Sequence, residues 1–540
     1  MDVLTLASAL ALMLLIAGLS VLGQRLKITS PFLMLVAGIA LAFVPGMPSW
    51  TLDPDLIFLG LLPPLLYISG VNMSWRGFRS NLRPILMLAI GCVVFTAAAV
   101  AVVSRYLLGL PWVIGFLLGA IVSPPDAVAP IAILRSLSLP RRMTTVLEGE
   151  SLINDATALV IFGFALTALA TGSFSLAAAS IKFIVIVCAE VAFGIAVAWT
   201  MLHLRDRAAD ARAEVLLALA TPFIAFWPPR ALGGSGVVAC VVAGLWVSWN
   251  GRRLIRPATR LQGFFIWDLV NWVVEALLFL LTGLQARAVV ERVASHSWRE
   301  ALTASLLVTA TIIIVRFIWV FSATYISRLL PQPLQADQPR GWRTPFVISY
   351  AGLRGVVSLA AALSLPLMIN NHEFPQRDLV LFVTFVVIAV TLLGLGTTLA
   401  PLVRALGIAQ SGVTEAVNNK RAERAVRLEG VTAVLNALKE CVNRLSPSAT
   451  FKALCQRHAD RREQFTATAD VTTADDPVSD VGQLQLQLLD VERTAIMRAY
   501  DENRLTDEAR RRIERELDLE EARERHILGN VGMMDIEPRG

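Results

Sequence analysis

The sequence predicts an all-α membrane protein with about thirteen transmembrane helices, followed by a soluble helical tail. Hydrophobic residues make up 55% of the 540 residues and charged residues only 17%, and the mean hydropathy is +0.62. Soluble globular proteins carry about 25% charged residues, so this composition excludes a soluble fold. Apolar runs long enough to span a membrane recur as far as residue 407 and then stop.

Thirteen apolar runs are candidate spans, and together they form a predicted membrane domain over residues 1–407. The first run has no basic segment before it and is too long for the core of a signal peptide, so we expect it to be retained. The eighth and ninth runs are the least distinct, because only Pro228-Pro229 and Gly233-Gly234 separate them. The runs cover residues 3–22, 29–46, 55–74, 84–108, 112–135, 144–172, 176–201, 213–231, 233–250, 262–290, 299–327, 343–370 and 378–407.

The charge of the loops predicts the orientation of these spans in the inner (plasma) membrane. If the N-terminus lies outside, most loop Arg and Lys residues fall on the cytoplasmic side, as the positive-inside rule requires. An odd number of spans then leaves residues 408–540 in the cytoplasm. This charge-rich tail reads as polar helices around a Thr- and Asp-rich linker. It is either a regulatory or dimerising segment or a merely solvated one.

Composition also limits the chemistry. The five cysteines include no CxxC pair, so neither a zinc site nor a disulfide framework is predicted. The net charge of +6 comes mostly from arginines in short loops, and we expect no nucleic-acid partner. We expect no cofactor either, and the lipid bilayer is the expected surrounding of the first 407 residues.

The start of the sixth run holds the first candidate site, formed by Glu150, Ser151, Asn154 and Asp155. At a rise of 1.5 Å per residue, Asp155 lies about 10 Å deeper than Glu148. An ionisable group at that depth costs several kcal/mol unless it is paired, hydrated or protonated, which makes it a functional candidate. Ser151 and Asp155 share one helix face, and Glu150 and Asn154 form a second pair beside them. An acidic first helical turn is the alternative for Glu148.

Two of the runs are interrupted. Three prolines and Asp126 lie in the middle of the fifth run, and two glycines and Arg354 lie in the middle of the twelfth. Proline breaks a helix, and broken backbone at membrane depth survives only where it is buried or lines a cavity. With the seventh run as a linker, each break falls in the fifth helix of a six-helix half. The sequence therefore predicts two inverted six-helix repeats with broken helices 5 and 12.

Three more charged residues lie inside apolar runs. Glu275 and Arg316 are predicted to be buried structural charges, since an unpaired charge at that depth is expensive. Glu190 has no evident partner in the sequence.

These motifs resemble those of the sodium/proton exchanger family of monovalent cation:proton antiporters. The resemblance covers about residues 1–407 and includes the helix that carries Glu275. It rests on Glu150-Ser151-Leu152-Ile153-Asn154-Asp155, Ser123-Pro124-Pro125-Asp126, Gly352-Leu353-Arg354-Gly355 and Pro63-Pro64-Leu65-Leu66.

The resemblance implies a binding site for cation and proton. Asp155 resembles the carboxylate that binds the two in turn, Ser151 resembles a side-chain ligand, and the backbone near Pro125 offers carbonyl oxygens. Asn154 resembles the neighbour that orients the site. The family also implies a homodimer in which a core domain moves against a dimerisation domain.

The resemblance further implies that Glu150 and Arg354 form a buried ion pair and that Asp126 is the charge at the helix crossing. Two departures stand out. Ile68 occupies the position in the third run where many relatives carry an acid, and the Asp-Pro order of the fifth run is altered to Pro125-Asp126.

The physics of a buried carboxylate suits exchange. Burial disfavours the charged form of Asp155, whereas a bound cation favours it. Oxygen ligands from Asp155 and Ser151 suit a hard monovalent cation, Na+ first and Li+ or K+ as alternatives. We predict an electroneutral Na+/H+ antiporter working by alternating access, because Asn154 cannot release a proton. A K+/H+ antiporter of the same fold is the alternative.

Two functions of other classes are further alternatives. An intramembrane aspartyl protease could use Asp126 and Asp155, but neither lies in a Gly-x-Gly-Asp context. A membrane sensor that transports nothing would signal through the tail, which has no nucleotide-binding glycine loop. The antiporter accounts for the buried charges and both breaks, so it is the preferred prediction.

Overall fold

The computed structural model is almost entirely helical in the residues that it describes. These are residues 3–26, 28–45, 54–134, 137, 139–172, 175–208, 210–293, 297–326, 341–369, 372–374, 376–442, 449–467, 477–502 and 507–532. Strands β1 (Met368–Ile369) and β2 (His372–Glu373) form a short antiparallel pair. The chain divides into two compact units, Met1–Ala416 and Val417–Gly540.

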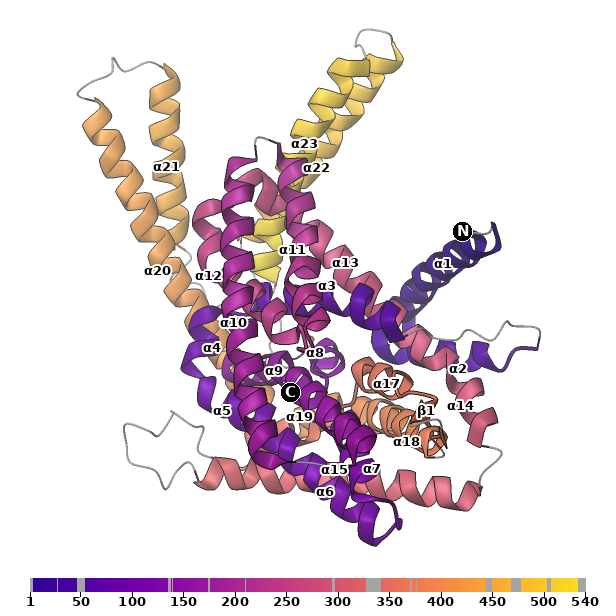
Figure 1. The fold of residues 1–540 in the computed structure, drawn as a ribbon. Helices are drawn as coiled ribbons and strands as arrows, with labels where there is room; N and C mark the ends of the chain where they lie inside the picture. Colours follow the sequence, from indigo (N-terminus) through magenta and orange to yellow (C-terminus); the bar gives the residue numbers. More distant parts are fainter. Residues whose placement is uncertain are drawn as a thin grey trace. The chain divides into compact units, whose positions relative to one another are not determined.

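The first half of the larger unit follows the first six predicted runs, with helices in each of them (Figure 1). Short π-helical segments precede two of the α-helices. The elements are α1 (Val3–Leu26), α2 (Ser30–Ala42), η1 (Leu56–Leu61), α3 (Leu62–Asn72), α4 (Trp75–Ser80), α5 (Leu82–Leu86), η2 (Met87–Cys92), α6 (Val93–Tyr106), α7 (Trp112–Val122), α8 (Val128–Leu134) and α9 (Arg141–Thr171).

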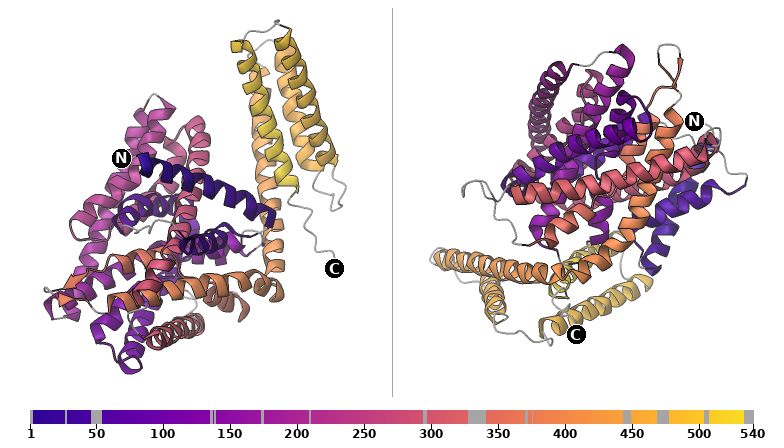
Figure 2. Two further views of the ribbon diagram at one scale, coloured as in Figure 1. Left: turned by 90° about the vertical axis from the view of Figure 1, so that its right-hand side faces the viewer. Right: turned by 90° about the horizontal axis from the view of Figure 1, so that it is seen from below.

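The second half likewise places helices in the remaining seven runs (Figure 2). Helix α11 continues through Pro228 and Pro229, so residues 232–236 separate the eighth and ninth runs. The elements are α10 (Leu176–Arg207), α11 (Ala211–Ala231), α12 (Val237–Leu254), α13 (Pro257–Leu284), α14 (Ala286–Val293), α15 (Trp298–Ile326), α16 (Arg343–Tyr350), α17 (Val356–Leu363), α18 (Arg377–Val390), η5 (Thr391–Leu395) and α19 (Gly396–Ala405).

Seven helical segments in the described ranges are long and apolar enough to cross a membrane on their own. The protein is therefore a multi-pass membrane protein. Five shorter apolar helices accompany them. The seven segments are Leu82–Tyr106, Arg141–Thr171, Ala177–Arg207, Ala211–Ala231, Gln262–Val293, Trp298–Ile326 and Arg377–Ala405.

Glycines bring two pairs of helices into backbone contact. A Cβ on Gly38 of α2 would lie 2.9 Å from the Cα of Gly283 in α13. A Cβ on Gly70 of α3 would lie 3.2 Å from the Cα of Gly244 in α12. Small residues allow such close approach of helices in a membrane. The two contacts correspond to each other when each of the first six runs is matched to the run seven places later.

Both predicted interruptions are present, and they cross. Helix α7 ends at Val122 and α8 begins at Val128, while α16 ends at Tyr350 and α17 begins at Val356. The backbone N–H of Asp126 in the first break donates to the carbonyl of Leu353 in the second, at 2.8 Å. The breaks therefore satisfy part of each other's backbone, which membrane lipid could not do.

Glu190, for which the sequence showed no partner, holds the start of α12. Its carboxylate accepts hydrogen bonds from the backbone N–H groups of Ser235 (2.5 Å), Gly236 (3.0 Å) and Val238 (3.1 Å). These donors have no partner within α12, and an anion there also complements the helix dipole. Glu190 is thus a structural residue that joins α10 to α12.

The smaller unit is built from helical hairpins. It contains most of α20 (Ile408–Val442) together with α21 (Ala449–Ala467), α22 (Pro477–Asp501) and α23 (Asp507–Gly532). Arg493 of α22 binds Asp518 (2.5 Å) and Glu521 (2.8 Å) of α23. Hydrogen bonds from Arg525 and Arg493 hold the pKa of the Glu521 carboxyl below its usual value.

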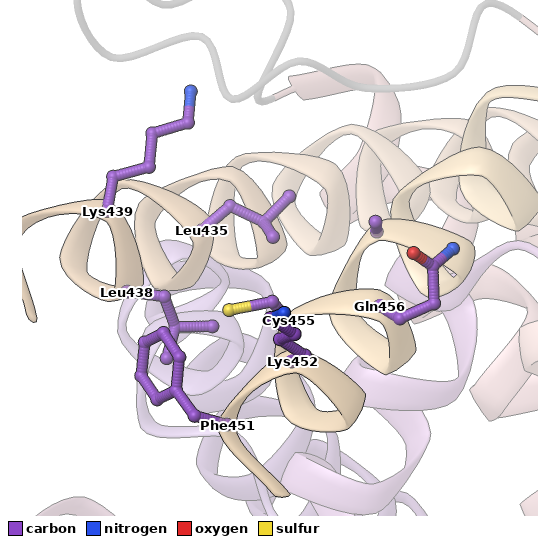
Figure 3. A pocket seen from close by; sticks show the side chains of 8 residues that line it. Leu435, Leu438, Lys439, Phe451, Lys452, Cys455 and Gln456 are labelled. Atoms are coloured by element: carbon purple, nitrogen blue, oxygen red, sulfur yellow. The ribbon is translucent and has the colours of Figure 1, made fainter. Parts of the chain in front are cut away.

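A hollow of about 530 Å³ lies between α20 and α21. Figure 3 shows the side chains of Leu438, Phe451 and Cys455 gathered between the two helices, while Lys439 extends away from them. The hairpin therefore has a mainly apolar interior with a charged rim.

Candidate functional site

Helix α9 presents two different faces to the rest of the larger unit. Glu150 and Asn154 are turned into the protein and are 1% and 0% exposed. Ser151 and Asp155, one residue further along in each case, are half-buried and line a cavity. The two pairs predicted from four-residue spacing are therefore both present, on adjacent faces of one helix.

Both faces of α9 contact the break between α7 and α8. The amide of Asn154 donates to the carbonyl of Pro125 at 2.5 Å. The backbone N–H of Ala127 donates to the hydroxyl of Ser151 at 3.4 Å. The proline break leaves backbone groups without helical partners, and α9 supplies partners for two of them.

Asp126 lies at the crossing of the two breaks, as the resemblance implied. Its carboxylate accepts a hydrogen bond from the backbone N–H of Val128 at 2.8 Å and so begins α8. It also lies against Gly355, where any Cβ would collide with the Asp126 side chain. A glycine is therefore required at position 355 for the two breaks to meet.

The cavity beside Asp155 has a volume of about 140 Å³ and is bordered by α3, α8, α9, α13 and α17. Four carboxylates line it: Asp126, Glu148, Asp155 and Glu275. Its uncharged polar lining consists of Ser69, Asn72, Ser151, Asn271 and Ser358. A polar cavity of one charge sign, set between apolar helices, attracts cations.

Glu150 pairs with Arg316 of α15, which corrects the expected pair with Arg354. The two guanidinium nitrogens of Arg316 lie 2.6 and 3.0 Å from the two carboxylate oxygens of Glu150. Both side chains are 2% exposed. Glu150 faces α15, and the sequence could not show which of two buried arginines reaches that face. Arg316, predicted as a separate structural charge, is therefore the partner of Glu150.

Arg316 also holds the end of α16. It donates to the backbone carbonyls of Ser349 (3.2 Å) and Ile348 (3.1 Å), which lie in the last turn of that helix. A Cβ on Gly352 would collide with the Arg316 side chain, so a glycine is needed at position 352 to leave space for this side chain. One arginine thus links α9, α15 and the second break.

Arg354 binds within its own break. Its guanidinium donates to the carbonyl of Gly352 at 3.1 Å, and its backbone N–H donates to the hydroxyl of Thr391 at 3.1 Å. The side chain is 1% exposed. A positive charge next to the freed carbonyls at the end of α16 offsets the helix dipole, as expected for a charge in a broken helix.

Glu275 lies on the cavity wall, where the sequence predicted only a structural charge. The amide of Asn271, one turn earlier on α13, donates to the Glu275 carboxylate at 2.5 Å. Ile68 of α3 lines the same cavity and offers no ligand. The spacing of Asn271 and Glu275 was a usable signal, since two polar residues one turn apart in an apolar run share one helix face.

The arrangement suits a single monovalent cation. Within the described ranges, no three His, Cys, Asp or Glu side chains form a group that could hold a metal ion such as zinc. Asp155 and Ser151 supply oxygen atoms, which hard cations prefer. The cavity gives these atoms access to an ion or to water.

A known protein family matches the sequence of the larger unit. The model of the family described as "Sodium/hydrogen exchanger, transmembrane" matches residues 11–405. An "uncharacterized Na(+)/H(+) exchanger" of Mycobacterium tuberculosis is 33% identical over 515 residues, which are 93% of each chain.

Other relatives carry more specific names. The Na(+)/H(+) antiporter ApNhaP of Aphanothece halophytica is 31% identical over 430 residues, or 79% of this chain and 78% of the relative. A sodium, potassium, lithium and rubidium/H(+) antiporter of Bacillus pumilus is 29% identical over 408 residues, or 73% of this chain and 60% of the relative. The solved structure of the sodium proton antiporter MjNhaP1 of Methanocaldococcus jannaschii has the same fold. Its TM-score is 0.60 at 19% identity, over 75% of this chain and 98% of that one.

Proposed function

The chain belongs to the sodium/hydrogen exchanger family of antiporters, and from this premise we propose that it exchanges Na+ for H+ at Asp155 by alternating access. The relatives are transporters rather than enzymes. The observation that carries the proposal is the pair Asp155 and Ser151, which faces the polar cavity beside two crossed helix breaks.

The proposed cycle uses one carboxylate for two ligands. Burial disfavours a bare charge on Asp155, so the group is occupied either by a proton or by a cation. Ser151 supplies a second oxygen, while Asn154 and Pro125 fix the backbone next to the site. Movement of α9 and the breaks relative to α3 and α13 would then expose the site to each side of the membrane in turn.

Na+ is the proposed cation because most of the named relatives are described by Na+ alone. Potassium is the second candidate, since the printed name of the Bacillus pumilus relative includes it. Both ions would use the same oxygen atoms, so only transport measurements across the alkali metals distinguish them.

Exchange is proposed to be electroneutral. Asn154 lies where a second acid would titrate, and the carboxylate of Glu150 is occupied by the bidentate contact with Arg316. The measurement is transport in proteoliposomes under an imposed potassium–valinomycin potential. A rate independent of voltage supports one cation per proton, and a rate that follows the voltage contradicts it.

The architecture proposed for this function is a homodimer of two inverted six-helix repeats in the inner membrane. The matched contacts Gly38–Gly283 and Gly70–Gly244 support the repeats. The N-terminus is proposed to lie outside and residues 408–540 in the cytoplasm, where they regulate exchange. The physiological task would be homeostasis of pH and sodium.

Everted membrane vesicles test the proposal. After respiration acidifies the lumen, added Na+ should release the proton gradient in vesicles that contain the wild type. The Asp155→Asn variant, which keeps the shape but loses the charge, should release none. Gradient release by Asp155→Asn would contradict the assignment, and failure of the wild type with every alkali cation would favour a membrane sensor that transports nothing.

A further inference from the structure

Glu275 of α13 lines the cavity beside Asp155, which is called the exchange cavity below. Ser151 and Asp155 line the α9 side, while Asn271 and Glu275 line it from α13. Glu148, on the same face of α9 two turns before Asp155, also belongs to the α9 wall. The carboxylates of the cavity therefore come from α9, from α13 and, with Asp126, from the first break.

The carboxylate of Glu275 is held in place. The amide of Asn271 donates to it at 2.5 Å, which fixes its orientation. Helix α13 is itself fixed by the backbone contact of its Gly283 with Gly38 of α2. Glu275 therefore presents its carboxylate from a packed helix rather than from a loop.

The remaining part of this wall carries no other acid. Helix α3 contributes Leu65, Leu66, Ile68, Ser69 and Asn72 to the cavity, all uncharged. From α13 come Asn271, Glu275, Leu278 and Phe279. On the side formed by these two described helices, Glu275 is the one ionisable lining residue.

We infer that Glu275 is an affinity-determining residue of the exchange cavity, one that attracts the cation to Asp155 and sets its apparent affinity. This inference rests on the proposed function and assigns exchange itself to Asp155 alone. A charge in a cavity with low-dielectric walls raises the local concentration of counter-ions, by about tenfold or more. This role replaces the purely structural role that the sequence predicted for Glu275.

The main variant is Glu275→Gln, measured in proteoliposomes as KM for Na+ and as maximal rate. Gln keeps the size of the side chain and an oxygen that accepts from Asn271, so it removes little besides the charge. We expect KM for Na+ to rise about tenfold with the maximal rate retained. Glu275→Asp, which restores the charge, should recover most of the affinity.

Asp268→Asn is the matched control. Asp268 lies on the same helix two turns before Glu275, is exposed, and is not among the residues lining the cavity. Loss of its charge should leave KM unchanged. Glu275→Ala is the second variant. If Glu275→Gln reaches the membrane poorly, Glu275→Ala should show the same rise in KM.

The outcomes separate this inference from the proposed function. An unchanged KM in Glu275→Gln, with Asp155→Asn inactive, overturns the inference and leaves the proposed function standing. Complete loss of exchange in a stably folded Glu275→Gln also overturns it, because Glu275 would then itself bind the exchanging ion. An equal rise in KM in Asp268→Asn would show a general surface-charge effect and contradict it as well. Wild-type protein that exchanges no cation at all defeats the proposed function first.

Discussion

The two adjacent faces of α9 place similar side chains in opposite environments. The Glu150–Asn154 face is closed, because Arg316 binds the carboxylate and Pro125 accepts from the amide. The Ser151–Asp155 face borders the cavity, and in the described ranges the Asp155 carboxylate has no ion pair or hydrogen bond. Two acids five residues apart on one helix therefore have different tasks.

The difference shows how a buried acid is made structural or functional. A buried charge is tolerable when a partner satisfies it fully, and removing the partner then costs about 3–5 kcal/mol. An acid without a fixed partner must bind a proton or an ion instead. The partner, rather than the depth, distinguishes Glu150 from Asp155.

The largest change in stability is expected when the closed face loses its ion pair. Glu150→Ala and Arg316→Ala should each lower the stability of the folded protein by about 3–5 kcal/mol, because each leaves a buried charge unpaired. The double variant should be clearly less harmful than the sum of the two. Thermal unfolding in detergent measures this.

Arg354→Ala is the comparison for that cycle. Arg354 is as deeply buried as Arg316 but binds the carbonyl of Gly352 rather than Glu150. Its loss should combine with Glu150→Ala far more nearly additively. Coupling as strong as that of Arg316 would mean that both arginines share Glu150 equally, and the assignment of Arg316 as its partner would be wrong.

A smaller loss is expected for Asn154→Ala. It leaves the buried carbonyl of Pro125 without its donor, at a cost of about 1–3 kcal/mol, and should slow exchange by loosening the break. Thr157→Ala is the control, since among the described residues the Thr157 hydroxyl binds only its own helix, at the carbonyl of Ile153. Equal effects of the two variants on melting temperature and rate would count against the contact with Pro125.

On the Ser151–Asp155 face, called the open face because it borders the cavity, Ser151→Ala should change affinity rather than stability. It removes one oxygen near Asp155 and the weak acceptor of the Ala127 N–H, so KM for Na+ should rise a few-fold, about 1 kcal/mol. Maximal rate should be partly retained. A large drop in melting temperature without any change in KM would place Ser151 on the structural side of the comparison.

The smallest effect is expected at the start of α9. Glu415 of α20 accepts a hydrogen bond from the backbone N–H of Arg141 at 3.2 Å, where an acid also complements the helix dipole. A chain ending at residue 416 keeps this contact, and one ending at residue 407 loses it. Both should insert and exchange, with the shorter less stable by about 0.3–1 kcal/mol. A folded but inert longer chain would contradict a purely regulatory tail.

The sequence predicted the elements of the fold well, because hydropathy and proline act locally. Hydropathy predicted helices in the thirteen apolar runs, and proline and glycine predicted both breaks. Four-residue spacing predicted the two residue pairs on α9. Pairing across helices could not be predicted in the same way. Arg316 and Arg354 both lay in the middle of apolar runs, and nothing local indicated that Arg316 would reach Glu150 or that Glu190 would hold α12.

The position of Glu275 on the cavity wall was not predicted, for a related reason. A lone acid in an apolar run is typical of a buried structural charge, and only the packing of α13 beside α3 and α17 shows that Glu275 faces the cavity. Ile68 of α3 lines the same cavity, where many relatives carry an acid, and Glu275 supplies an acid to that cavity from α13 instead.

The most direct test of the division of α9 is the effect of Na+ on the melting temperature, compared with an equal concentration of a large organic cation. A ligand that binds only the folded state raises its stability, whether or not transport occurs. Wild-type protein and Glu150→Ala should both melt at higher temperature in Na+, although Glu150→Ala starts lower. Asp155→Asn should start near the wild type and gain nothing from Na+. A full Na+-dependent rise in Asp155→Asn would contradict the assignment of the cation to the open face.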